Sequence, residues 1–202
     1  MIANAYFARF DTPKYRDAGP VQRALIRRFV ARLHGLFLEA LPAESVLEVG
    51  VGEGFISGFL SERHPSIRFT GIDASAEEIE HLRREFPRVA GRVGSAYELG
   101  GLPGEHDLVV CAEVLEHLDA PERALDAMLA LRPKRLLFSV PHEPFFRLSN
   151  LARGRNVARF GNDPGHLNRW GIRSFRKLLE SRLDVLRLTT SYPWILALTA
   201  PR

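Results

Sequence analysis

Short apolar runs alternate with amphipathic segments through most of the chain, and this alternation predicts the fold. Five apolar runs are typical of strands, and each ends in a glycine, a proline or an acid: 45–50, 67–73, 89–94, 106–113 and 134–141. Several intervening segments repeat apolar residues every three to four positions, as amphipathic helices do. Apolar strands separated by helices indicate parallel βαβ units in a sheet that is covered on both faces. The carboxyl ends of the strands then meet at one edge, where we expect the functional loops.

Residues typical of helix starts predict where three of the helices begin. Ser75 with Glu78, and Asp119 with Glu122, have the spacing of capping boxes. In a capping box two side chains satisfy free backbone N–H groups at the helix start. Before the first strand, a proline at the start of residues 20–41 suits the first turn of a long N-terminal helix.

The C-terminal part departs from the alternation. Residues 141–170 show no regular periodicity and are rich in His, Arg, Asn, Phe and Gly, so we expect a functional loop that folds over the cleft as a lid. A helix follows, and the apolar runs 184–190 and 194–200 predict a closing antiparallel pair. The predicted fold is α/β: a doubly wound, Rossmann-like, mostly parallel sheet with an antiparallel last strand, an N-terminal helix and a lid inserted after the fifth strand.

Length and composition indicate a single globular domain. The 202 residues are 46% hydrophobic and 26% charged, which is ordinary usage for one domain of roughly 100–200 residues. Within it we expect an N-terminal helical cap over 1–43, a cofactor-binding core over 44–140, the lid over 141–170, and a closing helix and hairpin over 171–202.

Three features favour a soluble protein of the cytoplasm. The single cysteine, Cys111, excludes an internal disulfide and suits a reducing compartment. No apolar run approaches the roughly 20 residues that a bilayer span requires. The first residues lack the uninterrupted apolar core of a secretory signal.

Charge is distributed unevenly along the chain. Residues 44–140 carry seventeen acidic and ten basic side chains, a net charge of −7, whereas the segments before and after them are basic and bring the total to +4. A uniform nucleic-acid binder would not show this pattern, and no basic motif interleaved with aromatics appears. A site that holds a cationic cofactor beside an anionic acceptor would show it, and so would a solvated, arginine-rich surface.

A glycine-rich loop follows the first predicted strand. Gly50, Gly52 and Gly54 stand where the chain enters its first core helix, so the backbone can turn sharply and approach a ligand closely. Glu48 lies just ahead of the loop, where a carboxylate opposes a diphosphate but attracts a cation. Asp73 ends the second strand nineteen residues after Gly54, where a carboxylate accepts hydrogen bonds from ribose hydroxyls.

With this loop and these two acids, the sequence resembles the class I S-adenosylmethionine-dependent methyltransferases over about residues 44–190. LEVGVGEG is similar to the family's glycine-rich first motif, and GIDAS to its acidic second motif. DLVVCAEVLEHLDAPERAL is similar to the fourth strand and following helix of the small-molecule branch, which includes the ubiquinone-biosynthesis O-methyltransferases. The resemblance implies a seven-stranded sheet that ends in an antiparallel hairpin.

The resemblance also implies a cofactor site. The three glycines would lie against the methionine part of S-adenosylmethionine, Asp73 would bind the ribose diol, and Ala74 would lie beside the adenine. Family members often carry an Asp-Ala pair after the third strand, and here Ser95 and Ala96 stand in its place. The remaining expected lining residues lie at the end of the fourth strand: Cys111 and Ala112, under the sulfonium, and Glu113, at the border of the cofactor. For Cys111, a buried small side chain in a strand is an equally good interpretation.

Three histidines are candidates for proton transfer. His117 follows the fourth strand and His142 the fifth, so both lie at carboxyl ends of central strands, and imidazole is suited to proton transfer at neutral pH. His166 lies in the lid segment. The lid also carries aromatics suited to exclude water, Phe145, Phe146 and Trp170, and arginines suited to phosphate or carboxylate recognition or to a solvated surface: Arg147, Arg153, Arg155, Arg159 and Arg169.

The same segment suggests a metal site. Glu113, Glu116 and His117 have helical spacing that would place them on one side of a turn, and the lid would add His166. Two carboxylates and two imidazoles suit Mg²⁺, Mn²⁺ or Zn²⁺, which would lower the pKa of an acceptor hydroxyl. The pattern is similar to the metal sites of ubiquinone-pathway O-methyltransferases and of small-RNA terminal-ribose methyltransferases. An EVLEHL segment also occurs in relatives that have no metal requirement.

The predicted function is methyl transfer from S-adenosylmethionine, at oxygen, to a small or lipid-like acceptor, with an anionic acceptor expected from the charge pattern. Two alternatives stay open: a metal-dependent RNA terminal-ribose methyltransferase, which differs in its acceptor, and an NAD-dependent oxidoreductase, which belongs to another enzyme class. A protein with the fold but without turnover is a third.

Overall fold

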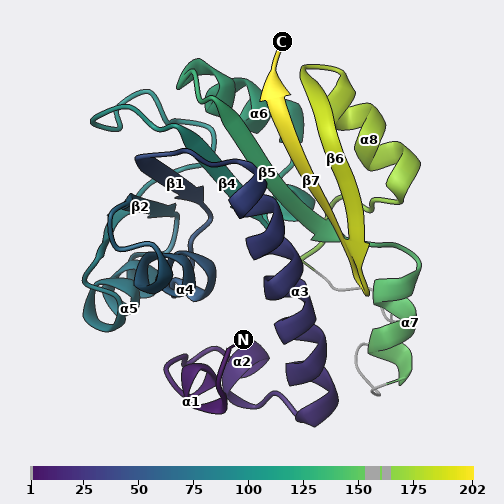
Figure 1. Cartoon of the computed structure of the whole chain (residues 1–202). Coiled ribbons are helices and arrows are strands. Elements are labelled where there is room, and N and C mark those ends of the chain that lie inside the picture. Colours follow the sequence, from purple (N-terminus) through teal and green to yellow (C-terminus); the bar gives the residue numbers. More distant parts are fainter. Residues whose placement is uncertain (1, 153–159, 161–164) are drawn as a thin grey trace.

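The part of the chain that the structure describes, residues 2–152, 160 and 165–202 of a computed structural model, is built on a seven-stranded sheet (Figure 1). Its strand order is β3-β2-β1-β4-β5-β7-β6. The strands are β1 (Ser45–Val49), β2 (Arg68–Asp73), β3 (Val89–Val93), β4 (Leu108–Ala112), β5 (Arg135–Pro141), β6 (Leu183–Ser191) and β7 (Trp194–Pro201). Strands β1 to β5 pair in parallel, and β7 runs antiparallel to both β5 and β6. The predicted doubly wound sheet with a closing antiparallel hairpin is confirmed.

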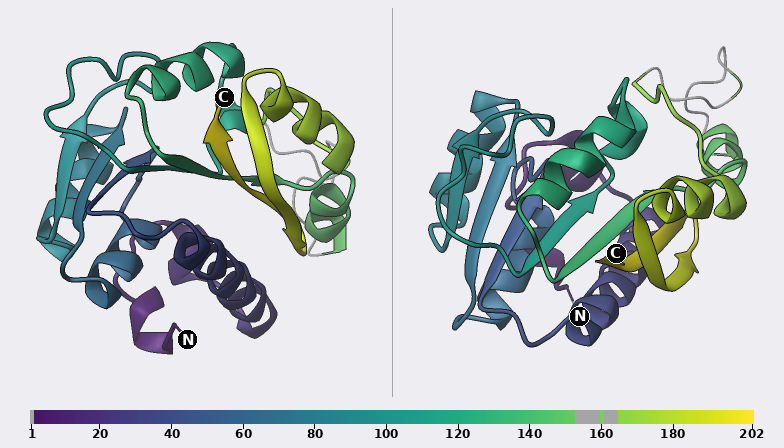
Figure 2. Two further views of the ribbon diagram at one scale, coloured as in Figure 1. Left: turned by 45° about the horizontal axis from the view of Figure 1, so that its top comes forward. Right: turned by 90° about the horizontal axis from the view of Figure 1, so that it is seen from above.

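Helices cover both faces of this sheet (Figure 2). One face packs against α1, α3, α4 and α5, and the opposite face against α6 and α8. The helices are α1 (Asn4–Phe7), α2 (Pro13–Arg16), α3 (Pro20–Glu39), α4 (Phe55–Arg63), α5 (Ala76–Glu85), the short 3₁₀ helix η1 (Leu115–His117), α6 (Pro121–Ala130), α7 (Phe145–Ala152) and α8 (Ile172–Glu180). Among the described residues, no helix combines the length and the apolar character needed to cross a bilayer.

Strand β4 contributes side chains to the hydrophobic cores on both faces of the sheet. Val110 and Ala112 belong to the core under α3 and α4, whereas Val109 and Cys111 belong to the core under α6 and α8. This alternation follows from the two-residue period of a strand. All five residues of β4 are buried, and each large apolar side chain among them contributes about 1.5–3 kcal/mol of burial free energy.

The structure corrects two expectations about local structure. Helix α6 begins after Ala120 with Pro121 in its first turn, and no side chain caps it. Asp119 instead accepts a hydrogen bond from the Tyr97 hydroxyl, so the predicted capping box at this helix was wrong. At α5 the Ser75 hydroxyl accepts the backbone N–H of Glu78 at 3.2 Å, as predicted.

The second correction concerns the lid segment. Helix α7 lies within residues 141–170, where no regular element was expected. The C-terminal end of the segment is hydrogen-bonded to η1, because the backbone N–H groups of Leu167 and Asn168 donate to the Glu116 carbonyl at 2.8 and 3.0 Å.

Candidate active site

The loop between β1 and α4 needs its glycines for backbone conformation and for space. Gly50, Gly52 and Gly54 have φ angles of +73°, +51° and +89°, in the left-handed region that L side chains rarely adopt. A Cβ at Gly50 would lie 2.2 Å from Val114 Cγ2, and one at Gly54 2.3 Å from Leu82 Cδ1. The loop backbone therefore lies closer to neighbouring elements than any side chain would permit.

Asp73 is held rigidly where β2 ends. Its Oδ2 accepts the backbone N–H of Gly52 at 2.9 Å, and its Oδ1 accepts the N–H of Ser75 at 2.9 Å. A carboxylate has about four lone-pair directions, so each oxygen keeps the capacity to accept a hydrogen bond from a ligand.

Glu48 is buried beneath the same loop. It is 2% exposed, and its Oε2 accepts hydrogen bonds from the backbone N–H and the hydroxyl of Ser57. Burial raises the pKa of Glu48 to about 8, against the opposing effect of the Ser57 hydrogen bonds. A cation near this carboxylate would favour its charged form.

Two cavities lie along the carboxyl ends of β1, β2 and β4. The first, the glycine-loop cavity, has a volume of about 340 Å³. The second, the Tyr97 cavity, has a volume of about 390 Å³ and is lined by Ala74, Ser95, Ala96 and Tyr97. Both cavities are also lined by Gly50, Asp73 and Glu113. Together they offer an elongated site that passes over Asp73.

A third cavity, the α7 cavity, lies on the other side of Glu113. It has a volume of about 460 Å³, and its wall includes Glu116, His117, Phe146 and His166. It shares Lys14, Ile26, Glu113 and Trp194 with the glycine-loop cavity. Two ligands in these cavities would therefore lie on either side of the same few side chains.

Glu113 occupies the junction of all three cavities. Its φ is +61°, and this left-handed residue separates β4 from η1. Ser139 Oγ donates to Glu113 Oε1 at 2.9 Å, and Trp194 Nε1 donates to Oε2 at 2.6 Å. Burial raises the pKa of Glu113, while Lys14 and these hydrogen bonds oppose the shift.

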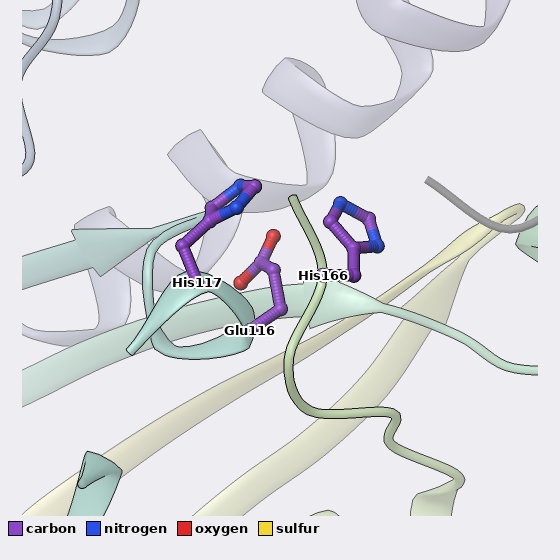
Figure 3. Close-up of side chains that lie close together, drawn as sticks. All are labelled: Glu116, His117 and His166. Atoms are coloured by element: carbon purple, nitrogen blue, oxygen red, sulfur yellow. The ribbon is translucent and has the colours of Figure 1, made fainter. Parts of the chain in front are cut away.

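Glu116, His117 and His166 converge at the wall of the α7 cavity (Figure 3). One ligand atom from each lies within 4.8 Å of the others, and the two imidazole ring centroids are 4.9 Å apart. His117 Nδ1 lies 2.9 Å from the Gly165 carbonyl. Glu113 was predicted to share a helical turn with this group. The chain instead makes a left-handed turn at Glu113, so its carboxylate binds Trp194 and stands apart from the cluster.

Comparison with known proteins shows which family the chain is similar to. A family model described as "Methyltransferase domain" matches residues 46–133, which include the glycine loop, Asp73 and the 113–117 segment. Over these residues the chain carries a methyltransferase domain, and it is similar to the class I S-adenosylmethionine-dependent methyltransferases.

Relatives of this chain include two proteins named as ubiquinone biosynthesis O-methyltransferases. The one from Dechloromonas aromatica is 32% identical over 151 residues, 65% of this chain and 63% of the relative. The mitochondrial one from Saccharomyces cerevisiae is 34% identical over 95 residues, 44% of this chain and 30% of the relative. The chain spans less than two thirds of the length of these curated relatives.

Among solved structures, the magnesium protoporphyrin IX methyltransferase of Synechocystis, determined with bound S-adenosylhomocysteine, has a similar fold. Its TM-score is 0.71 at 16% identity, and the match covers 98% of each chain. At this identity the likeness concerns the fold alone.

Two residues that the sequence predicted at the site lie outside these three cavities. Among the described residues that line the three cavities, neither Cys111 nor His142 occurs. Cys111 faces the core under α6 and α8, where burial raises the pKa of its thiol well above the usual value. His142 is half-buried, its ring meets Phe145 edge-on at 4.9 Å, and burial lowers its pKa. Arg153, Arg155 and Arg159 lie outside the described residues.

The structure adds site residues that the sequence did not indicate. Thr12, Lys14 and Tyr15, around the short helix α2, line the glycine-loop cavity, and Trp194 of β7 lines it together with the α7 cavity. A four-residue helix has too little periodicity to be recognised in sequence, and the position of Trp194 depends on the pairing of β7 with β5.

Proposed function

We propose that this chain transfers a methyl group from S-adenosylmethionine to an oxygen atom of a small or lipid-like acceptor. One observation carries the proposal: the glycine-loop cavity and the α7 cavity share Lys14, Glu113 and Trp194 as walls. A donor in the first and an acceptor in the second would be neighbours. Direct displacement at carbon needs this alignment above all, and orientation can contribute roughly 7–11 kcal/mol of barrier reduction.

The cofactor would extend across the glycine-loop and Tyr97 cavities. The ribose hydroxyls would donate to Asp73, whose two oxygens are already oriented by Gly52 and Ser75. The adenine would lie in the Tyr97 cavity. There the Ser95 hydroxyl accepts the backbone N–H of Tyr97 at 3.2 Å, so its own proton is available to a ring nitrogen.

The lining charge of the glycine-loop cavity favours a cationic ligand. Glu53, Asp73, Glu78 and Glu113 line it, and Glu48, which is protonated in the ligand-free protein at neutral pH, would ionise beside a bound cation. S-adenosylmethionine carries a sulfonium and an ammonium against one carboxylate, whereas an anionic diphosphate cofactor would be repelled. This charge balance supports S-adenosylmethionine over NAD.

His117 is the proposed base for the acceptor hydroxyl when no metal ion is bound; an ion at the cluster described next would take the same Nε2 lone pair and would itself promote deprotonation of the hydroxyl. A carbonyl oxygen can only accept, so the contact of Nδ1 with the Gly165 carbonyl assigns the proton to Nδ1 and leaves a lone pair on Nε2. As the acceptor oxygen bonds to the methyl carbon, its proton passes to Nε2. The methyl–sulfur bond breaks, and its electron pair stays on sulfur as neutral S-adenosylhomocysteine.

A divalent cation would fit the cluster of Glu116, His117 and His166. One carboxylate and two imidazoles within 4.8 Å are a donor set suited to Zn²⁺ or Mn²⁺. Such an ion would lower the pKa of a bound hydroxyl and orient it. An anionic acceptor is proposed only with the ion bound, since Glu113 and Glu116 otherwise outweigh Lys14 in the lining charge of the α7 cavity.

Calorimetry and isotope transfer test this function. We expect the protein to bind S-adenosylhomocysteine and not NAD. Incubation with methyl-labelled cofactor and a cytoplasmic metabolite extract should label a small molecule, and Asp73→Ala should abolish the labelling. Binding of NAD without binding of S-adenosylhomocysteine would overturn the proposal. Full activity after EDTA treatment would reject the cation and leave His117 as the base.

A further inference from the structure

The basic segments at the two ends of the chain are neighbours in the folded protein. Helix α3 belongs to the basic segment before residue 44, and β6 belongs to the basic segment after residue 170. Strand β6 is the last strand in the sheet order, and α3 contacts both β6 and β7 (Figure 1). The fold therefore brings together basic side chains that are far apart in the sequence.

A cavity, called the α3–β6 groove below, lies between these two elements. Its volume is about 530 Å³, within the range of about 300–1,000 Å³ that small-molecule sites have. Within the part of the chain that the structure describes, it shares no lining residue with the three cavities at the carboxyl ends of the strands. Three arginines line it, Arg28 and Arg32 of α3 and Arg187 of β6.

Small residues line the groove on its helix side. Ala31 and Gly35 lie one turn apart on α3, between the arginines and the end of the helix. A Cβ at Gly35 would meet no other atom of the described residues within 4 Å. The helix backbone is therefore open at this point, and a ligand could approach it closely.

Arg28 and Arg32 are available to a ligand, unlike the other two arginines of α3. Arg23 and Arg27 lie over the Phe7 ring, at 5.3 and 5.5 Å from its centroid. Across residues 2–152, 160 and 165–202, Arg28 and Arg32 have neither a hydrogen bond nor an ion pair. Like charges four residues apart destabilise a helix, so helix stability does not explain this pair.

Arg187 lines the groove from β6 and is held in position. Its Nε donates to Glu39 Oε2 at 3.0 Å, and its Nη1 donates to the Leu186 carbonyl at 3.4 Å. A guanidinium has five N–H donors, so Nη2 keeps both of its own. Glu39 is the one acid among the described lining residues, and Arg187 balances its charge. Arg28 and Arg32 therefore leave the groove with two uncompensated positive charges.

We propose that the α3–β6 groove binds the phosphate group of a small organic phosphate, with Arg28 and Arg32 on the helix side and Arg187 on the strand side. Guanidinium groups bind phosphate oxygens through paired hydrogen bonds. A phosphate monoester carries a charge of about −1.5 to −2 at pH 7, which matches the two uncompensated charges. The apolar side chain of Leu188 lines the same groove and would contact the organic part. This site does not rest on the function proposed above.

Calorimetry with inorganic pyrophosphate tests the groove, with EDTA present so that no cation at the histidine cluster binds the probe. The double variant Arg28→Gln/Arg32→Gln removes both uncompensated charges and should raise the Kd of pyrophosphate at least about tenfold. Arg173→Gln/Lys177→Gln is the matched control, because it removes two exposed basic side chains with the same four-residue spacing from α8, on the opposite face of the sheet. The control should leave the Kd unchanged.

Two further probes identify the source of the phosphate. Binding of glycerol 3-phosphate, lost in Arg28→Gln/Arg32→Gln, would assign a soluble phosphate ester to the groove. Sedimentation with phosphatidylcholine vesicles that contain phosphatidic acid, lost in the same variant and inhibited by pyrophosphate, would assign a lipid headgroup of the same chemistry.

The outcomes are separate from those that test methyl transfer. Failure of the unaltered protein to bind pyrophosphate, or an equal loss of affinity in the two double variants, would overturn the phosphate site. Binding of S-adenosylhomocysteine tests the proposed function instead, and neither double variant alters a residue that lines the three cavities of that site.

Discussion

Glu48 should make the stability of the ligand-free protein fall as the pH rises. Its carboxyl group is 2% exposed, and burial raises its pKa from 4.5 to about 8. In the unfolded chain the group ionises near its ordinary pKa, while in the folded protein it holds its proton up to about pH 8. The folded state therefore binds more protons between these values, and the stability from this group, complete below the unfolded pKa, is lost progressively until the folded pKa is passed.

The magnitude follows from the shift. Each pH unit within this window costs about 1.4 kcal/mol, so stability from this group should fall by about 3 kcal/mol between pH 5 and pH 7. Glu48→Gln removes the titration, and its amide oxygen can still accept from Ser57. The assay is urea unfolding of both proteins at several pH values, since other titrating groups cancel in the difference.

We expect Glu48→Gln to gain about 3 kcal/mol relative to the unaltered protein as the pH rises from 5 to 7. Bound S-adenosylmethionine should reduce this gain, because its positive charges favour the ionised carboxylate. A stability difference that stays constant across this range would show that Glu48 ionises as easily in the folded protein as in the unfolded chain, contrary to this prediction.

Three further predictions concern the loop, the ribose contact and the metal cluster. Gly50→Ala should destabilise the protein more than Gly104→Ala. Both glycines have a positive φ, so alanine would be strained by about 1–2 kcal/mol at either position, but of the two only Gly50 has a neighbour 2.2 Å from the added Cβ. Equal decreases in Tm would contradict this. Asp73→Asn should raise the Kd of S-adenosylhomocysteine about tenfold in calorimetry by removing charge-assisted acceptors, and an unchanged Kd would place the ribose elsewhere. Glu116→Gln and His166→Ala should each lower Mn²⁺ affinity at least about tenfold in titrations followed by electron paramagnetic resonance, whereas tight binding by both variants would separate the cluster from any metal.

The sheet and the glycine loop are features that the sequence predicts well, for physical reasons. Strands buried on both faces must be apolar throughout. The loop needs a glycine at every second position, 50, 52 and 54, because φ is positive there. Asp73 is predictable because it ends a recognisable strand. Each of these signals is local, so a single sequence suffices to detect it.

The junction between the cavities could not be predicted because it depends on long-range contacts. The orientation of Glu113 follows from its left-handed φ and from Trp194, 81 positions away. The spacing of Glu113 and Glu116 predicted that both lie on one face of a helix, but the helix η1 begins at Leu115, after Glu113. Lys14 lines the glycine-loop cavity because Glu53 accepts the backbone N–H groups of Asp11 and Thr12. Backbone groups are the same in every residue other than proline, so this contact could not be predicted from residue types.

A crystal structure with bound S-adenosylhomocysteine would show how the cofactor lies across these cavities. We expect adenine in the Tyr97 cavity, ribose hydroxyls on Asp73, and the sulfur atom at the wall formed by Glu113 and Trp194, facing the α7 cavity. Cofactor bound in the α7 cavity, or with its sulfur directed away from that wall, would contradict a transfer between the two cavities.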